Sequence, residues 1–531
     1  MSSASSTVME SAVLPFGSFD WFKRQLVPTR LREIRTAIMV AGAVLCVIIS
    51  MALQVPELAT SAYMVFFISK ESKLLTTITG VGGVIVLTIG IGATLLLYKF
   101  TYGHPELRIP GMAIALFLGM WLSRVLVIGP LGFLLGFVVA VSQSVGEEVP
   151  LPEQLVRGLL WLWVALAYAI AVTVVLNLLF LPDTPKTAAR PKPKSLFVPD
   201  AFTNPVHVHF ALKVTFAAMF CYIVYEAIDW TGIHTAFITC TFIALESTGA
   251  TLHKGLLRIG GCVIGGVLAL FTIVFLMPHM ETIASLIVVV ACASAIAGWV
   301  ATGTEIISYA GLQIAFAFFY SVFQGYAPDT DLDNVRNRVV GILFGLIVTG
   351  LVFRYIWPER TIDRLRGALR QVLLQLAKLL VIPSPQTAVK EGKPKAQALV
   401  AEISRELEQA QRQAELTGFE IGEPQAGDRV SLGNLEATLS RAEHMLDLAT
   451  SLTTDSAWTE WQQLPPDAQH AESELRKAIA KRVERAAASD EREDAGANLS
   501  TAFARWTETM QALKVKNSRV ALVSQIVTEV Q

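Results

Sequence analysis

Charge is scarce in this sequence. Of its 531 residues 16% are charged, 43 basic and 44 acidic, whereas 53% are hydrophobic. About 12% of the first 360 residues are charged, against roughly 26% of the remainder. This composition excludes an ordinary soluble enzyme and predicts a membrane body followed by a polar tail. The net charge of −1 gives no reason to expect a nucleic acid partner.

Cysteine pairs and catalytic motifs are also missing. The five cysteines lie inside apolar runs, none in a CxxC pattern, and the eight histidines are scattered. The sequence contains no phosphate-binding loop, no protein-kinase motif, no HExxH and no GxSxG. We therefore expect no metal site, no cofactor, no ATP hydrolysis and no enzymatic activity.

Long apolar segments fill most of the chain. Six lie before a break rich in Pro and Lys, and six follow it. The sequence predicts an all-α polytopic membrane protein of about 12 transmembrane helices. Its predicted parts are an interfacial N-terminus (residues 1–33), a first six-helix membrane repeat (34–182), a Pro/Lys-rich linker (183–205), a second six-helix membrane repeat (206–358) and a helical tail (359–531).

Basic residues predict the orientation. They cluster before the first apolar segment, in the linker and after the last segment. Short loops rich in Lys and Arg stay in the cytoplasm. The N-terminus, linker and tail are therefore predicted to be cytoplasmic, which requires an even number of crossings in each half.

The two halves resemble each other. A shift of about 175 positions lays Phe67, Ile68, Glu71 and Ser72 on Phe242, Ile243, Glu246 and Ser247. The glycine-rich strings that follow correspond if an insertion is allowed. Two halves of six segments share one orientation, so we predict parallel repeats with a path at their interface.

The tail shows helical periodicity, for example in Leu365, Leu369, Val372 and Leu376. Breaks at residues 418–428 and 464–466 suggest antiparallel hairpins. We predict a cytosolic helical bundle.

Candidate pathway residues concentrate between Asp229 and Arg258. Charges at membrane depth are costly and usually face protein or water. The guanidinium of Arg258 suits an organic anion, although an anchor to lipid phosphate is an equal alternative. For Lys254 the anchor interpretation is preferred. Asp229 lies at a tight turn on the outer side.

Carboxyl and imidazole groups could exchange protons. Glu246 and its repeat counterpart Glu71 are the candidates for proton coupling, with a solvated helix end as the alternative. His234 has a suitable pKa for this role, but a histidine at a helix start also caps or packs.

The later half adds a polar stripe. Glu305, Tyr309 and Gln313 share a helix face and either line a cavity or join helices. Arg336 is a further candidate, although it is expected to pair locally with Asp333. The predicted helix-packing glycines are Gly260, Gly261, Gly265 and Gly266.

Several motifs together resemble a known family. They are Asp229-Trp-Thr-Gly-Ile-His-Thr235, Arg258-Ile-Gly-Gly261, Tyr309-Ala-Gly-Leu-Gln313, Arg336-Asn-Arg-Val-Val-Gly341 and Trp357-Pro-Glu359. In these motifs the chain is similar to the fusaric acid resistance and aromatic acid exporter family, with the MdtO-like multidrug branch as the nearest match. Relatives often insert a cytosolic domain between the halves, where this chain has only its short linker.

The resemblance implies an inner-membrane efflux subunit of Gram-negative bacteria, driven by the proton gradient. Such a subunit works with a periplasmic adaptor and an outer-membrane channel, and family substrates are aromatic carboxylic acids or drugs. Membrane lipid and a second copy of the chain are further expected partners.

Two other functions stay open. One is a passive anion channel, favoured by the short helices and the basic cytoplasmic side. The other is a membrane scaffold that recruits partners through its helical tail.

Overall fold

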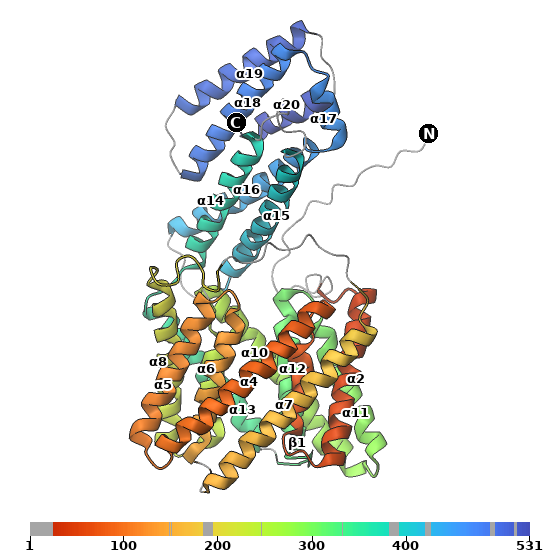
Figure 1. Ribbon diagram of the computed structural model, residues 1–531, viewed down its shortest axis with the longest axis vertical. Helices are drawn as coiled ribbons and strands as arrows, with labels where there is room; N and C mark the ends of the chain where they lie inside the picture. Colours follow the sequence, from red (N-terminus) through yellow and green to blue (C-terminus); the bar gives the residue numbers. More distant parts are fainter. Residues whose placement is uncertain are drawn as a thin grey trace. The chain divides into compact units, whose positions relative to one another are not determined.

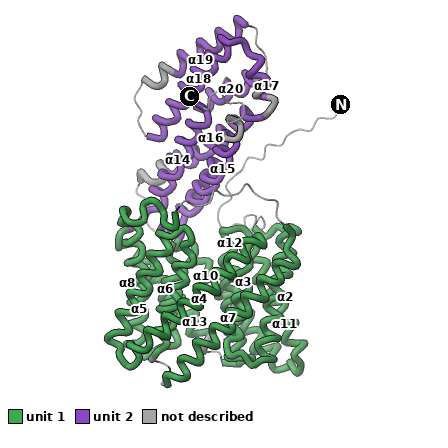
Figure 2. The backbone as a smooth tube through the Cα atoms, in the orientation of Figure 1, with its two compact units in different colours: residues 1–246, 251–357 green, residues 247–250, 358–531 purple. Residues whose placement is uncertain are grey.

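The computed structural model is built almost entirely from α-helices (Figure 1), and it describes residues 25–147, 149, 151–183, 195–245, 247–331, 333–381, 392–419, 426–488, 494–513 and 518–530. The chain forms two compact units (Figure 2). The membrane unit comprises residues 1–246 and 251–357, and the tail unit comprises residues 247–250 and 358–531.

Apolar helices make up the membrane unit. Within the described residues, nine helices are long and apolar enough to cross a membrane, and three more are shorter. The predicted all-α polytopic membrane protein is therefore confirmed. The helices are α2 (Arg30–Leu53), α3 (Leu58–Ile68), α4 (Lys73–Thr101), α5 (Pro105–Val125), α6 (Gly129–Ser144), α7 (Pro152–Phe180), α8 (Val206–Ala227), α9 (Thr235–Ile243), α10 (Thr248–Phe271), α11 (Ile283–Ala301), α12 (Glu305–Val322) and α13 (Asp333–Tyr355).

Two irregular elements interrupt this arrangement. A π-helical turn, Thr272–Leu276, follows α10. A short antiparallel ribbon joins α12 to α13 and consists of β1 (Phe323–Gln324) and β2 (Ala327–Pro328).

Helices from the two halves interlock. Figure 1 shows α2 beside α11 at one edge of the membrane unit and α5 beside α8 at the other, and both pairs pack together. Near the middle, α3 packs on α12. Phe242 of α9 makes edge contacts with Phe133 and Phe137 of α6, with ring centroids 5.2 and 4.8 Å apart. The two halves therefore contact each other at both edges and near the middle of the membrane unit.

Two glycines bring α10 against α12. A Cβ atom on Gly261 would lie 2.5 Å from the carbonyl oxygen of Ala310, and one on Gly265 would also meet the α12 backbone. Gly260 has open space around it, and at Gly266 the nearest atom would be 3.7 Å away. Of the four predicted packing glycines, Gly261 and Gly265 are those at the close approach.

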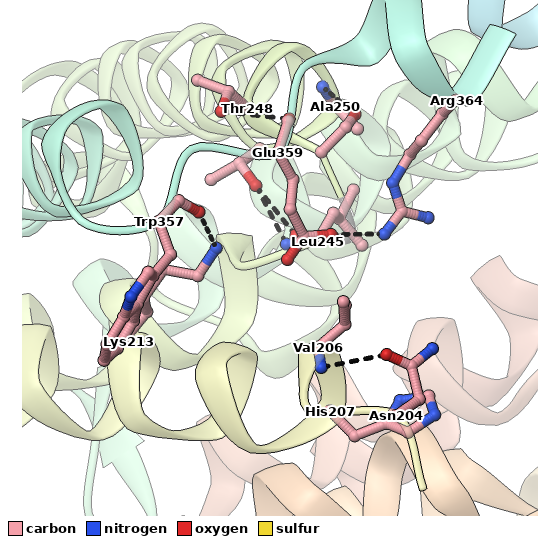
Figure 3. A network of polar contacts seen from close by, with 12 residues as sticks. Asn204, Val206, His207, Lys213, Leu245, Thr248, Ala250, Trp357, Glu359 and Arg364 are labelled. Carbon is pink, nitrogen blue, oxygen red and sulfur yellow. Dashed lines mark hydrogen bonds and ion pairs between the residues drawn. The ribbon is translucent and has the colours of Figure 1, made fainter. Parts of the chain in front are cut away.

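The end of α13 is fixed to α8. Buried Lys213 donates its Nζ to the carbonyl of Trp357 at 3.0 Å and lies 4.8 Å from the centroid of the Phe353 ring. Trp357 takes a left-handed φ of 43° and stacks on His209. Figure 3 shows the Lys213 contact.

The first turn of α10 belongs to the tail unit. The backbone N–H and the hydroxyl of Thr248 both donate to the carbonyl of Glu359, at 3.2 and 3.4 Å. The N–H of Gly249 donates to Thr361 Oγ1 at 3.3 Å. Arg364 holds the Glu359 carboxylate at 2.6 Å (Figure 3). The start of the tail thereby satisfies donors that a helix N-terminus leaves without intrahelical acceptors.

The rest of the tail unit is a helical bundle with its own core. Leu365, Val372 and Leu376, at the predicted spacing, are buried there. The tail helices are α14 (Thr361–Val381), α15 (Gly392–Thr417), α16 (Ala426–Ser451), α17 (Asp455–Gln462), α18 (Pro466–Ala488), α19 (Asp494–Ala512) and α20 (Ser518–Val530).

A buried ion pair fastens α20 to α18. The Arg519 Nη2 lies 2.7 Å from Glu472 Oε1, and both side chains are almost completely buried. Arg519 also donates Nη1 to the carbonyl of Ala457 at 2.9 Å. Each charge is therefore compensated, which makes its burial tolerable.

Candidate functional site

A cavity of roughly 550 Å³ lies at the interface of the two halves. Residues of α3, α4, α6 and α7 line it from the first half, and residues of α9, α10, α12 and α13 line it from the second. The volume is typical of pockets for drug-sized molecules. Most of the wall is apolar, and it includes the rings of Tyr63, Phe67, Phe137, Phe242, Phe316, Tyr320 and Phe323.

Arg258 supplies a buried cation to this wall. Its Nε donates to Thr239 Oγ1 at 3.1 Å, and its Nη1 donates to Tyr309 Oη at 3.2 Å and to Gln313 Oε1 at 3.0 Å. The side chain is only 2% exposed, and its Nη2 has no hydrogen-bond partner in the described part of the chain. The predicted residues Arg258, Tyr309 and Gln313 therefore form one cluster.

Arg338 of α13 supplies a second cation, which the sequence analysis did not select. Its Nη1 donates to the carbonyl of Phe316 at 3.1 Å. The guanidinium carbon lies 4.4 Å from the centroid of the Phe316 ring and 4.9 Å from that of Tyr320. Arg258 approaches the same Phe316 ring at 5.8 Å. Two guanidinium groups thus converge on one aromatic side chain of the cavity wall.

Neither arginine makes an ion pair with a carboxylate of the residues that the structure describes. Burying an uncompensated charge costs several kcal/mol, so such charges normally find a partner. An anion in the cavity would supply the missing negative charge.

Glu57 brings the opposite charge from the first half. It precedes α3, lines the cavity and accepts a hydrogen bond from Thr60 Oγ1 at 2.7 Å. The Thr60 hydroxyl also lies 2.8 Å from Tyr320 Oη. Burial raises the pKa of the Glu57 carboxyl above its ordinary value, and the hydrogen bond from Thr60 opposes that rise.

Two further predicted residues lie at or beside this cluster. His234 lines the cavity, with its Nδ1 3.2 Å from the carbonyl of Thr231. Lys254 is placed one turn before Arg258 on α10 and lies over the Tyr309 ring at 4.9 Å.

The other predicted residues are elsewhere. Glu71 is exposed and lies 3.7 Å from Arg35. Asp229 is exposed at the turn after α8, with a φ of 54°. Glu305 is exposed at the start of α12. Glu246 lies outside the described residues.

Arg336 is exposed as well. Its Nη1 pairs with Asp333 at 3.1 Å, so the expected local pair is present. It therefore differs from its neighbour Arg338, whose side chain turns into the bundle two residues later.

A metal site finds no support in the geometry. No cluster of three His, Cys, Asp or Glu side chains suited to a metal ion occurs among the described residues. Four cysteines, Cys46, Cys221, Cys240 and Cys262, are buried free thiols, and Cys292 is exposed.

The fold and the cavity define a multi-pass helical membrane protein with a largely apolar cavity between its two halves. Comparison with known proteins shows which family of membrane proteins this chain is similar to. The profile of the fusaric acid resistance protein-like family matches residues 219–352, which carry Arg258, Tyr309, Gln313 and Arg338. The resemblance expected from the sequence motifs is thereby confirmed.

The similar curated proteins belong to one group. Multidrug resistance protein MdtO of Shigella flexneri and that of Escherichia coli K12 are each 36% identical to this chain over 206 residues. The matched stretch covers 39% of this chain and 30% of each relative. The chain thus spans less than a third of the length of these relatives, and the similarity supports the MdtO-like branch.

Proposed function

We propose that this protein is an inner-membrane efflux transporter that moves small aromatic carboxylates through the interface of its two halves. The observation that carries the proposal is the aromatic cavity with two buried guanidinium groups that lack a carboxylate partner among the described residues. An aromatic ring would contact the phenylalanine and tyrosine side chains, and its carboxylate would compensate the buried charge. Drugs of similar size, as in the MdtO name, are a second substrate class for the same cavity.

Two parallel repeats of six crossings are part of the proposal. The packing supports it, because pairs of helices in the first half have counterparts in the second: α2 with α7 as α8 with α13, and α3 with α7 as α9 with α13. Across the interface, α2 packs on α11 as α8 packs on α5. Reciprocal contacts of this kind are expected of two similar units related by an axis along the membrane normal.

A constant shift of 175 positions supports the same repeat. Lys70 N donates to Thr76 Oγ1 at 3.0 Å, and Leu245 N donates to Thr251 Oγ1 at 3.0 Å. Gly80, Gly90 and Gly136 correspond at this shift to Gly255, Gly265 and Gly311. At every one of these six glycines a Cβ atom would press on a neighbouring helix. The shift therefore needs no insertion between the glycine-rich strings.

The two halves of the proposed repeat differ in the charge that they bring to the cavity. The counterpart of Arg258 is Gly83, and both residues line the cavity. Among the described lining residues, both guanidinium groups thus come from the second half, which would bind an anion against one side of the path.

We further propose that the N-terminus, linker and tail are cytoplasmic and that the proton gradient drives export. Proton exchange at Glu246 and Glu71 stays a hypothesis from the sequence. A periplasmic adaptor, an outer-membrane channel and a second copy of the chain are proposed partners, on the strength of the family resemblance alone.

The test is transport in isolation. Inverted membrane vesicles that contain this protein alone would be given labelled benzoate, with and without an imposed proton gradient. We expect accumulation that depends on the gradient and stops when an uncoupler is added. Equilibration without accumulation would establish the passive anion channel instead. If vesicles without the protein take up benzoate in the same way, neither the transporter nor the channel is supported.

A further inference from the structure

Glu57 is the single carboxylate among the described residues that line the cavity. Basic residues from three other elements share this lining: Arg258 on α10, Arg338 on α13 and His234 before α9. The titratable phenols of Tyr63 on α3 and Tyr320 on α12 complete the ionisable lining. Any proton taken up by Glu57 therefore changes the charge that a bound anion meets.

A hydrogen-bond chain connects Glu57 to the cationic side. The one hydroxyl proton of Thr60 is donated to the carboxylate at 2.7 Å, so Tyr320 donates to Thr60 across 2.8 Å. The Tyr320 ring in turn packs on the Arg338 guanidinium. This series of hydrogen bonds crosses the interface of the halves, because Thr60 is on α3 and Tyr320 is on α12.

The charge balance follows from these three residues, with His234 taken as neutral. Glu57 makes no ion pair with either arginine, but the three charges of the described lining sum to +1 when Glu57 is ionised and to +2 when it is protonated. We propose that the charge of Glu57 sets how tightly the cavity binds organic anions, and that protonation of Glu57 strengthens this binding. This inference rests on the proposed function and adds the residue that makes the cavity depend on pH. It assigns Glu57 no part in driving export, because a proton and an anion that bind together do not exchange for each other across the membrane.

The expected direction follows from the environment of Glu57. Burial raises its pKa, so the carboxyl takes up a proton at a higher pH than an exposed glutamate does. Below that pKa the carboxyl is neutral and an anion binds more tightly; above it the carboxylate repels the anion. By linkage, anion binding must also raise the affinity of Glu57 for a proton.

The experiment measures binding rather than transport. Equilibrium binding of labelled benzoate to the purified full-length protein in detergent would be compared at about pH 5.5 and about pH 8, where benzoate itself stays ionised. We expect the affinity for benzoate to be at least about five-fold higher at the lower pH. This factor is the lower end of the coupling usually found between two binding sites. Glu57→Gln should bind tightly at both pH values, because its side chain is neutral throughout.

Two matched variants identify the group that titrates. Glu153→Gln removes an exposed carboxylate that pairs with Arg157 at 2.6 Å and is not among the lining residues, so the pH dependence should persist. His234→Gln should also retain it. If the pH dependence survives in Glu57→Gln, or disappears in His234→Gln alone, the inference is wrong while the proposed function stands. If the wild type binds no benzoate at either pH, both fail.

Discussion

At the scale of single residues, the membrane unit contains arginines in two different environments. Arg336 is exposed and paired with Asp333, whereas Arg258 is 2% exposed and is held by hydroxyl and amide oxygens alone within the described part of the chain. Neutral acceptors orient a guanidinium but leave its net charge in place. That remaining charge is available to a ligand.

Arg258→Gln should lower the affinity for benzoate at least ten-fold, because truncating a buried charge that binds an opposite charge costs about 2–5 kcal/mol. Arg336→Gln is the matched control, since its charge is exposed and locally neutralised. Equilibrium binding of labelled benzoate would measure both. Equal affinity in the two variants would rule out Arg258 as the anion ligand.

Thr60→Val should move the midpoint of the pH dependence upward. The hydroxyl of Thr60 stabilises the ionised form of Glu57, so its loss raises the pKa of that carboxyl further. We expect a shift of about half to one pH unit, measured from benzoate affinity across the titration. A shift to lower pH would contradict the assigned direction of the hydrogen bond.

The sequence indicated part of this cluster. Arg258, Tyr309 and Gln313 stood out because polar residues in apolar helices are few and costly. Arg338 was not among the predicted residues, because its place two positions after Arg336 does not show that one side chain is buried and the other exposed. Glu57 lay in a short polar loop, and only the packing of α3 against α12 brings it to the cavity.

At the scale of elements, the contact of α10 with α12 positions Arg258. The hydrogen bonds from Arg258 to Tyr309 and Gln313 require the two helices to approach closely, and Gly261 and Gly265 permit this. Side chains larger than hydrogen at these two positions would separate the donor from its acceptors.

Gly261→Ala should therefore lower the thermal stability of the detergent-solubilised protein, by an overpacking cost of about 1–3 kcal/mol. The added Cβ would lie 2.5 Å from the Ala310 carbonyl oxygen and 2.6 Å from Gln313 Cβ. Gly260→Ala is the control, since no atom lies within 4 Å of its added Cβ. An equal loss of stability in both variants would refute the close approach.

The tail offers a second test at this scale. Arg519→Ala should destabilise α18 and α20 by about 3–5 kcal/mol, because it removes the guanidinium that pairs with the buried Glu472 carboxylate. Lys477→Ala, which removes an exposed pair with Glu474, should cost less than about 1 kcal/mol. Hydrogen exchange of the full-length protein would report both, and similar exchange rates in the two variants would count against the buried pair.

Elements were more predictable than their contacts. Apolar runs of sufficient length indicate helices by themselves, and the periodicity around Leu365 and Leu376 indicated the tail helices. Helix pairing was not deducible in this way, because the same apolar face can pack on several neighbours. The packing of α2 on α11, from opposite halves, needed the structure.

At the scale of the whole molecule, the proposed even number of crossings in each half has a direct consequence. The two chain ends and the linker should face the same compartment. A fluorescent protein that folds only in the cytoplasm should therefore fluoresce when fused at the C-terminus and when inserted in residues 184–194. Fluorescence at one site and its absence at the other would require an odd number of crossings between them.

The boundary between membrane unit and tail unit does not coincide with a single point in the chain. Thr248 and Gly249 begin the helix that carries Arg258, yet their N–H groups are satisfied by Glu359 and Thr361. A fragment cut at residue 358 would deprive that helix of its acceptors. An exchange of the tail between relatives should therefore leave Glu359 and Thr361 on the membrane half, so that the first turn of α10 keeps its acceptors.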